Sequence, residues 1–323
     1  MTEVQQRSVL ALAACLALAL AGAGEAARPQ PRAGAGLPRA GPSGPSLGAE
    51  EAAALLERYG SLKGYHKALA FRHRAAHAEG CTQATGRPDC VSVTQGNETT
   101  YFESLAAFAG VPADEVAAWE ALPASWDWRD HGVVSAAKDQ GRCGSCWAFA
   151  SAEAMESHWA LASGHLEDLS IQQILDCTPN PQHCGGTGGC HGSIPQLAFA
   201  QIDEQGGLAG EWSYGYTSYS GKDAPECAFA PEKLHATSSA RGKTATVQLP
   251  SNQAAPLMQA LVKFGPVPVS VDAGSWHLYK GGVWDKCNQK EPTLDHAVNL
   301  VGYGTDAKTG EDYWLVRNSW GAG

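Results

Sequence analysis

Two cysteines three residues apart, directly before a tryptophan, constrain this chain more than any other feature. They are Cys143 and Cys146 in the stretch QGRCGSCWAFA. Such a pair has four ordinary uses: a redox dithiol, half of a zinc site, a disulfide anchor, or a nucleophile beside a disulfide. Each use needs a different context, so the rest of the chain decides among them.

The N-terminus indicates a compartment in which cysteines oxidise. After Arg7 the chain runs SVLALAACLALALAGAG, an apolar stretch that is short for a membrane span and is followed by small residues near Ala23 and Ala26. This layout predicts a secretory signal peptide over residues 1–26, cleaved from the mature protein. Disulfides persist in that pathway, and the chain has ten cysteines.

Composition excludes some functions. The net charge is −10 and no basic stripe is present, so we expect no nucleic-acid partner. We interpret the mild acidity as favouring solubility. No segment after the N-terminal run is apolar enough to span a bilayer, so we expect no membrane contact in the mature form. The 323 residues, 44% of them hydrophobic, suffice for one large domain or two smaller ones.

The first third of the chain has several distinct segments. Residues 28–48 are rich in Pro and Gly, which predicts a linker, and residues 49–80 place apolar side chains at near-helical spacing. Cys81 and Cys90 enclose a short loop and could bridge each other. The tripeptide NET at Asn97 predicts an N-linked glycan in a secreted chain.

The composition changes at Leu122, where we place a domain boundary. A long helix is predicted from the N-cap Ser145 to Gly164, and a shorter one begins near Ser170. After Gly242 come four β-branched or aromatic runs, TATVQL, VPVSVDAG, HAVNLVGYG and YWLVRNSWG. Helices first and strands later, without βαβ alternation, predict an α+β fold.

This context does not favour the redox or zinc use. A redox dithiol needs a preceding strand and an alternating α/β pattern, and neither is visible. Structural zinc pairs two short ligand clusters, but the second cluster, CTPNPQHCGGTGGCH, has no clean two-residue spacing. A zinc site would draw on six candidates: Cys143, Cys146, Cys177, Cys184, Cys190 and His191.

That Cys146 is a nucleophile is the more specific hypothesis. Cys146 lies at the start of the long predicted helix, where the helix dipole favours the reactive thiolate. It needs a base and a group that orients the base, both from elsewhere in the chain. His296 opens the strand-like run HAVNLVGYG, and Asn318 follows the run YWLVR. Alone, these would be an ordinary histidine and a turn asparagine.

The blocks DQGRCGSCWAFA, DHAVNLVGYG and YWLVRNSWG, in this order, resemble the papain family of cysteine proteases, in particular its cathepsin L-like members. The resemblance covers nearly all of residues 122–323. It implies a papain-like α+β fold, with a helical left domain whose central helix carries the nucleophile. A β-barrel-like right domain and a cleft between the two domains complete that fold.

The resemblance implies a role for each motif residue. Cys146 would be the nucleophile, and His296 the base that shares an ion pair with it and later protonates the leaving amine. Asn318 would orient the histidine ring, and Trp320 would cover their hydrogen bond. The Gln140 side chain and the Cys146 backbone N–H would donate to the oxyanion.

The resemblance also implies substrate contacts. Gly192 falls at the first glycine of a pair that lines the cleft, whereas Ser193 replaces the second and still offers its backbone to a substrate strand. The main specificity pocket would be mostly apolar, which favours an apolar or aromatic side chain at the second position before the cleaved bond. The residues in or beside this pocket are Ile194, Pro195, Ser270, Leu294, Asp295 and Ala297.

Two disulfides are implied in the same way, Cys143–Cys190 and Cys177–Cys227. The usual partner of Cys287 would lie beyond the last residue, and Cys184 is extra. Three alternatives stay open for Cys184: a bond to Cys287, a bond to another chain, or a free thiol.

The sequence departs from the family in two respects. It stops at NSWGAG, whereas family members usually continue for some tens of residues, so we read it as C-terminally truncated. If this is the true product, we expect an unstable protein with little activity, because the lost segment would expose core surface and unpaired strand edges. Residues 27–121 occupy the place of an inhibitory propeptide but lack its usual helical signature. An unrelated N-terminal domain is the alternative.

The sequence thus predicts a monomeric zymogen with a signal peptide (1–26), a linker and propeptide (27–121) and a peptidase domain (122–323). It would be a thiol-dependent endopeptidase, secreted or in a lysosome or vacuole, that cleaves proteins or peptides through an acyl-enzyme. Its own propeptide would inhibit it, and no metal or cofactor is expected. The rival hypotheses are a non-catalytic peptide-binding relative and a zinc-dependent module.

Overall fold

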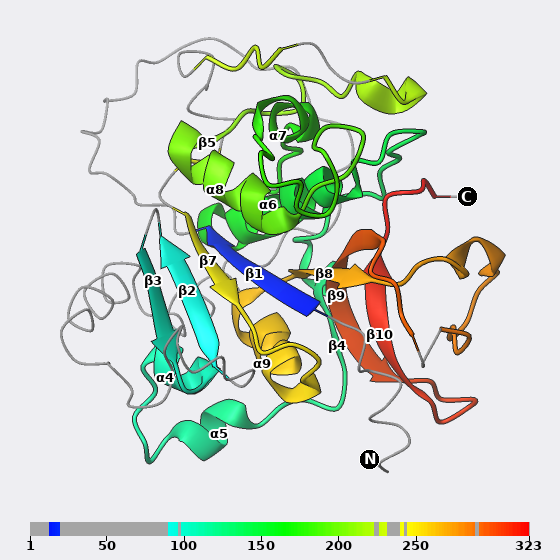
Figure 1. The fold of residues 1–323 in the computed structure, drawn as a ribbon. Helices are drawn as coiled ribbons and strands as arrows, with labels where there is room; N and C mark the ends of the chain where they lie inside the picture. Colours follow the sequence, from blue (N-terminus) through cyan, green and yellow to red (C-terminus); the bar gives the residue numbers. More distant parts are fainter. Residues whose placement is uncertain are drawn as a thin grey trace, which may run out of the picture.

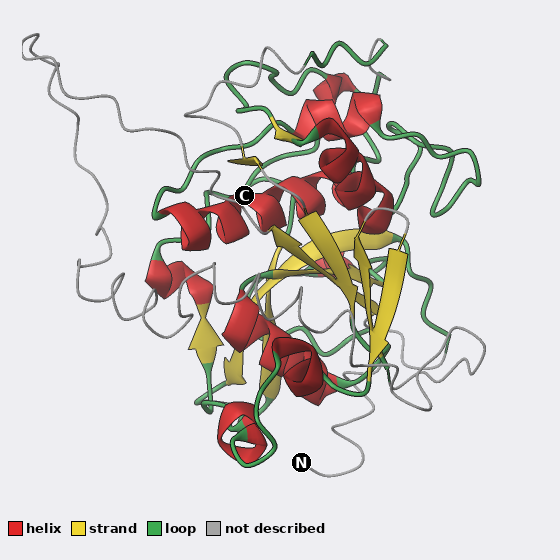
Figure 2. Cartoon of the chain, turned by 90° about the vertical axis from the view of Figure 1, so that its left-hand side faces the viewer, coloured by secondary structure: helices red, strands yellow, loops and turns green. Residues whose placement is uncertain are grey.

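The computed structural model describes residues 13–19, 90–95, 98–222, 226–230, 240–241, 244–287 and 291–322. The chain divides into a group of helices and a large antiparallel sheet. The helices are α6 (Cys146–Ser163), α7 (Ile171–Cys177) and α8 (Pro195–Gln205). They form the upper part of the molecule in Figure 1, and Figure 2 shows most strands below them.

Helix α6 is the centre of the helical part. Residues 147–158 are all buried, polar side chains such as Glu153 and Glu156 included, so the helix is enclosed on every face. It lies between α7 and α8 on one side and the sheet on the other. The helix begins after the N-cap Ser145 and ends at Gly164, whose φ of 76° suits glycine. Both ends were predicted from the sequence and are confirmed.

The remaining helices are shorter. Helix α7 is capped by the Ser170 hydroxyl, which accepts from the Gln173 N–H over 2.9 Å, and α8 has Pro195 in its first turn. The others are α4 (Leu105–Ala109), α5 (Val116–Glu120) and α9 (Ala254–Phe264), with 3₁₀ turns η1 (Trp128–His131), η2 (Ser218–Ser220) and η4 (Trp276–Leu278).

The main sheet is antiparallel throughout, in the order β10-β9-β8-β1-β7-β2-β3, and β4 also pairs with β9. Its strands are β1 (Ala13–Ala19), β2 (Val91–Gln95), β3 (Glu98–Phe102), β4 (Trp126–Asp127), β7 (Thr244–Gln248), β8 (Val267–Val271), β9 (His296–Thr305) and β10 (Asp312–Arg317). A second sheet pairs β5 (Gly207–Leu208) with β6 (Ala240–Arg241). The four strand runs predicted after Gly242 are β7 to β10.

The register of two strands positions the site. Strand β9 is buried along its length except at Thr305, because helices and strands cover both its faces. It runs antiparallel to β10, with Asn299 opposite Arg317. The first residue of β9, His296, therefore lies near the residue that follows β10, Asn318.

The apolar core has two parts. One surrounds α6, α7 and α8, and the other lies between the sheet and α9. The sheet-side cluster includes Phe108 and other residues that precede Leu122, among them Val91, Phe102 and Leu105. The described residues just before the predicted domain boundary thus share a core with those that follow it.

Several predictions for the N-terminal part of the chain concern residues that the structure does not describe, or stay untested. Strand β1 comes from the apolar run predicted as a signal peptide, and removal of that run stays a prediction. The linker 28–48, the helical region 49–80, Cys81 and Asn97 lie outside the described residues. Cys90 is disulfide-bonded. In the described part of the chain no helix is long and apolar enough to cross a membrane.

Replacing Phe108 by Ala tests the shared core. Phe108 is 2% exposed, and its ring centroid lies 5.4 Å from that of Phe102 and 6.0 Å from that of Phe264. We expect the variant to lose about 3–5 kcal/mol of unfolding free energy in urea denaturation. Leu278→Ala, at a side chain that is 57% exposed, is the control. A loss below about 1 kcal/mol for Phe108→Ala would show that the segment does not stabilise the sheet.

Candidate active site

Cys146 is the first residue of α6 and is partly buried. Burial raises the pKa of its thiol, and the Asp295 carboxylate adds to this rise. The backbone N–H groups of Ala297, Trp147 and Cys146 itself lower the pKa, because N–H groups near the sulfur favour the thiolate. The sulfur therefore lies against the residue that follows His296.

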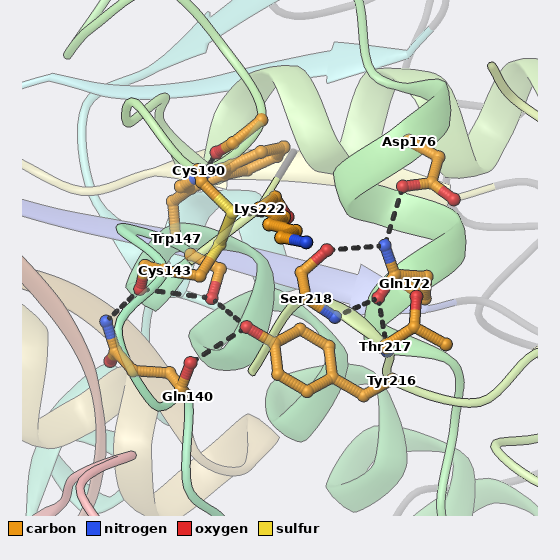
Figure 3. The surroundings of a disulfide bond; sticks show 12 residues. Gln140, Cys143, Trp147, Gln172, Asp176, Cys190, Tyr216, Thr217, Ser218 and Lys222 are labelled. Carbon is orange, nitrogen blue, oxygen red and sulfur yellow. Dashed lines mark hydrogen bonds between the residues drawn. A yellow bond between two sulfur atoms is a disulfide. The ribbon is translucent and has the colours of Figure 1, made fainter. Parts of the chain in front are cut away.

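The loop before Cys146 is held in place by a disulfide. Cys143 is bonded to Cys190 (Figure 3), and the Gly144 N–H donates to the Cys190 carbonyl over 2.9 Å. A Cβ at Gly144 would lie 2.5 Å from that carbonyl oxygen, so no other residue fits there. The loop that leads to Cys146 is thus bound to the segment that contains Gly192.

His296 and Asn318 are joined by a hydrogen bond of 2.7 Å between Nε2 and Oδ1. The Asn318 Oδ1 atom also accepts from the Ser319 N–H over 2.8 Å, which identifies it as the carbonyl oxygen. A carbonyl can only accept, so Nε2 carries a proton and the neutral ring keeps its lone pair on Nδ1. Burial lowers the pKa of His296, and the bond to Asn318 opposes this.

Two tryptophans shield the His296 ring, which is 7% exposed. Trp320 is stacked on it, with centroids 4.8 Å apart and planes at 29°. Trp276 meets the ring edge-on at 6.3 Å and 88°. Sequence reasoning found Trp320 but missed Trp276, which carries no local signal.

Two contacts orient the Gln140 carboxamide, and a third holds its backbone N–H. Its Oε1 accepts from the Ser319 hydroxyl over 2.6 Å, and its backbone N–H donates to the Ser319 carbonyl over 2.8 Å. Its Nε2 donates to the Cys143 carbonyl over 2.9 Å. An amide nitrogen has two protons, so the second remains for another acceptor. The arrangement can supply a nucleophile, a base held by a carbonyl, and N–H donors for a developing negative charge.

The predicted substrate-contacting residues come from two places. On the helical side they lie at the start of α8, whose first residue is Pro195: Gly192, Ser193 and Ile194 directly precede it, and Ser193 is buried. On the sheet side, Ser270 of β8 lies opposite Ala297 of β9. Leu294 is 50% exposed just before β9, and Asp295 accepts the Ala273 N–H over 2.9 Å. The apolar pocket that these residues were predicted to form stays a prediction.

Comparison with known proteins decides the family. A family model described as "Papain family cysteine protease" matches residues 122–323. The chain belongs to the papain family. The family and the α+β fold predicted from the sequence are therefore confirmed.

Individual relatives agree with this assignment. The chain is similar to "Cathepsin L" of Sarcophaga peregrina, with 42% identity over 202 residues that cover 62% of this chain and 56% of that protein. It is 39% identical over 206 residues to "Procathepsin L" of Mus musculus, covering 62% and 57%. The chain thus spans a little over half the length of these curated relatives.

A solved papain-family structure is also similar. It is the bromelain protease from Ananas comosus in complex with the E64 inhibitor, with 35% identity and a TM-score of 0.51. The match covers 62% of this chain and 85% of that one.

The cysteines of this papain-family chain are divided between bonds and free thiols. Cys177–Cys227 is also a disulfide, so both pairings that the resemblance implies are present. Three of the candidate zinc ligands are thereby used in disulfides. Free thiols remain on Cys146, Cys184 and Cys287. Within the described ranges, no three His, Cys, Asp or Glu side chains are placed to hold a metal ion.

A hollow of about 600 Å³ adjoins Trp320 and the residues on either side of Gln140. The sequence did not predict it, since its walls come from separate segments. They are Asp139, Gly141, Arg142, Tyr219, Ser220 and Trp320.

A buried charge cluster lies beneath the site and was also not predicted. Arg317, which precedes Asn318, places its NH2 nitrogen 3.3 Å from Glu153 Oε1, and its NH1 nitrogen lies 3.8 Å from Glu156. Burial raises the pKa of Glu153 to about 8, although the charge of Arg317 opposes the shift. Lys138 pairs with Glu156 as well.

Glu153→Gln tests this cluster through the pH dependence of stability. The folded-state pKa of Glu153, about 8, exceeds the ordinary 4.5, so its contribution is fully present below about pH 4.5 and is lost as pH rises towards 8. Buried His158 acts in the opposite sense. Its pKa is lowered to about 4 from 6.5, so its contribution is present above pH 6.5 and is lost as pH falls.

Between pH 6.5 and 8, Glu153 therefore changes protonation in the folded state while His158 does not. We expect the wild-type unfolding free energy to fall there by up to about 1.4 kcal/mol per pH unit more than that of Glu153→Gln. Urea denaturation at a series of pH values measures this, with Glu120→Gln at an exposed carboxylate as the control. Parallel pH profiles for wild type and Glu153→Gln would contradict the assignment.

Proposed function

We propose that this chain is a thiol-dependent endopeptidase that hydrolyses peptide bonds in proteins through an acyl-enzyme. One observation carries the proposal. The Cys146 sulfur, at the N-terminus of a buried helix, lies against the Ala297 N–H, while the neighbouring His296 is held by Asn318 at 2.7 Å. A binding protein or a zinc module has no physical need for this set.

In the first step, His296 Nδ1 takes the proton of the Cys146 thiol. Burial works against the resulting ion pair, because it raises the pKa of the thiol and lowers the pKa of the imidazole. The N–H groups around the sulfur stabilise the thiolate, and the Asn318 carbonyl stabilises the imidazolium. These N–H groups and the Asn318 carbonyl thus offset the effect of burial on the ion pair.

The thiolate then attacks the carbonyl carbon of the substrate. Negative charge moves to the carbonyl oxygen, where the free Nε2 proton of Gln140 and the Cys146 backbone N–H stabilise it. The imidazolium of His296 gives its proton to the leaving amine as the C–N bond breaks. Water, deprotonated by the same imidazole, hydrolyses the thioester and frees Cys146.

Substrate would bind in an extended conformation beside Gly192 and Ser193 through main-chain hydrogen bonds. The second side chain before the cleaved bond would enter a mostly apolar pocket, which favours an apolar or aromatic residue. No long histidine-containing insertion was recognised in the sequence, which supports cleavage within a chain over removal of its last residue. The protein would act as a monomer, without cofactor or metal.

Residues 27–121 would be an inhibitory propeptide, in keeping with the name "Procathepsin L" of one relative. The apolar N-terminal run and the disulfides favour a secretory route that ends in a lysosome, a vacuole or outside the cell. Cleavage after residues 1–26 and a glycan on Asn97 belong to the same proposal.

A thiol-reactive epoxide tests the proposal. We expect it to label Cys146 and to spare Cys184 and Cys287, whose free thiols serve as internal controls. Peptide mapping by mass spectrometry locates the adduct. We expect the label on Cys146 to disappear in His296→Ala, because no base remains to form the thiolate.

Two outcomes would refute the proposed endopeptidase function. One is peptide hydrolysis that survives in Cys146→Ala. The other is a protein that binds peptides but is neither labelled at Cys146 nor hydrolytic, which is the behaviour of the non-catalytic relative. Metal analysis of the same sample tests the zinc-dependent module.

A further inference from the structure

A tyrosine outside the sequence motifs contacts both ends of the stretch, Gln140 to Cys146, that supplies the oxyanion donors. The Tyr216 hydroxyl donates to the Gln140 backbone carbonyl over 2.9 Å (Figure 3). The same oxygen lies 2.8 Å from the hydroxyl of Ser145, the N-cap of α6. Tyr216 therefore contacts both the amide donor's backbone and the start of the helix that carries Cys146.

The direction of these bonds follows from the partners. A carbonyl accepts only, so the single Tyr216 proton goes to Gln140, and Ser145 donates to the tyrosine oxygen. An N-cap serine ordinarily accepts an N–H from the first turn of its helix, but the Ser145 side chain makes no such bond. The Ser145 hydroxyl thus faces Tyr216 instead of the first turn of α6.

Tyr216 is itself fixed by its surroundings. Its backbone N–H donates to Glu211 Oε1 over 2.7 Å, and its ring meets Phe149 of α6 edge-on, with centroids 5.0 Å apart. The next two N–H groups, of Thr217 and Ser218, both donate to Gln172 Oε1. This anchors the segment to α7, so the hydroxyl has a defined position.

Gln140 is thus held from two sides. Ser319 binds its side chain and its N–H from the sheet side, and Tyr216 binds its carbonyl from the helical side. The distance between the Gln140 amide and the Cys146 N–H depends on both contacts. These two donors must converge on one carbonyl oxygen for either to contribute fully.

We propose that Tyr216 is a positioning residue for the oxyanion hole, setting the Gln140 loop against the N-terminus of α6 through its hydroxyl. This inference rests on the proposed endopeptidase function. It predicts that loss of the hydroxyl weakens stabilisation of the oxyanion and leaves the reactivity of the thiol unchanged.

Tyr216→Phe is the direct test, since it removes the hydroxyl and keeps the ring against Phe149. We expect kcat to fall about tenfold with little change in KM, a smaller loss than the 100-fold or more that follows removal of an oxyanion donor. A peptide aldehyde, whose hemithioacetal oxygen occupies the hole, should bind about tenfold more weakly. Epoxide alkylation of Cys146 forms no oxyanion, so its rate should stay within twofold.

Tyr214→Phe is the matched control. It removes a hydroxyl two residues away, one that donates to Asp176 Oδ2 over 2.8 Å and does not touch the oxyanion loops. We expect wild-type values for kcat, aldehyde affinity and alkylation rate. Titrating active sites with the epoxide expresses kcat per folded enzyme, so partial unfolding of a variant does not change the result.

A double-mutant cycle with Gln140→Ala shows whether Tyr216 acts through Gln140. We expect Tyr216→Phe to have no further effect on kcat once the Gln140 side chain is gone. Equal losses in kcat and alkylation rate, or additive effects in the cycle, would overturn the inference. So would an active wild type whose Tyr216→Phe and Tyr214→Phe variants behave alike. A wild type that is neither labelled at Cys146 nor active overturns the proposed function itself, and the inference with it.

Discussion

The site depends on one interface, the packing of helix α6 against strand β9. The Asn299 side chain on β9 donates to the Ala150 carbonyl of α6 over 3.1 Å in a buried position, and Ala297 packs into the helical core cluster. This packing places the Cys146 sulfur beside the Ala297 N–H, one residue from His296. A shift of α6 along β9 by about 1 Å would separate Cys146 from His296, and in an enzyme misplacement on that scale can cost about 100-fold in rate.

The same interface contains buried charge. Glu153 and Glu156 on α6 face Arg317 at the end of β10. Such groups rarely add stability, because the loss of hydration offsets their attraction. Arg317 also donates to the Ala136 carbonyl over 2.6 Å, which fixes the end of β10 just before Asn318. Glu153 therefore costs stability as pH rises towards 8, whereas Arg317 helps to fix the chain just before Asn318.

Local sequence patterns predicted part of the fold and of the site. An N-cap serine and a final glycine placed Cys146 at the start of α6, and apolar runs placed His296 and Asn318 at strand ends. Helices α8 and α9 and the β2–β3 hairpin were not predicted. Contacts with partners distant in the chain leave no local pattern, so the sequence did not indicate three residues that surround the site: Tyr216, Trp276 and Arg317.

The central claim is that Cys146 carries the acyl group during turnover. Rapid mixing with an activated ester substrate, an acid quench and mass spectrometry of the intact chain measure it most directly. We expect a burst of product in the first turnover and one acyl group on the peptide that contains Cys146. Hydrolysis with no acylated chain, or acylation at Cys184 or Cys287 instead, would contradict the account.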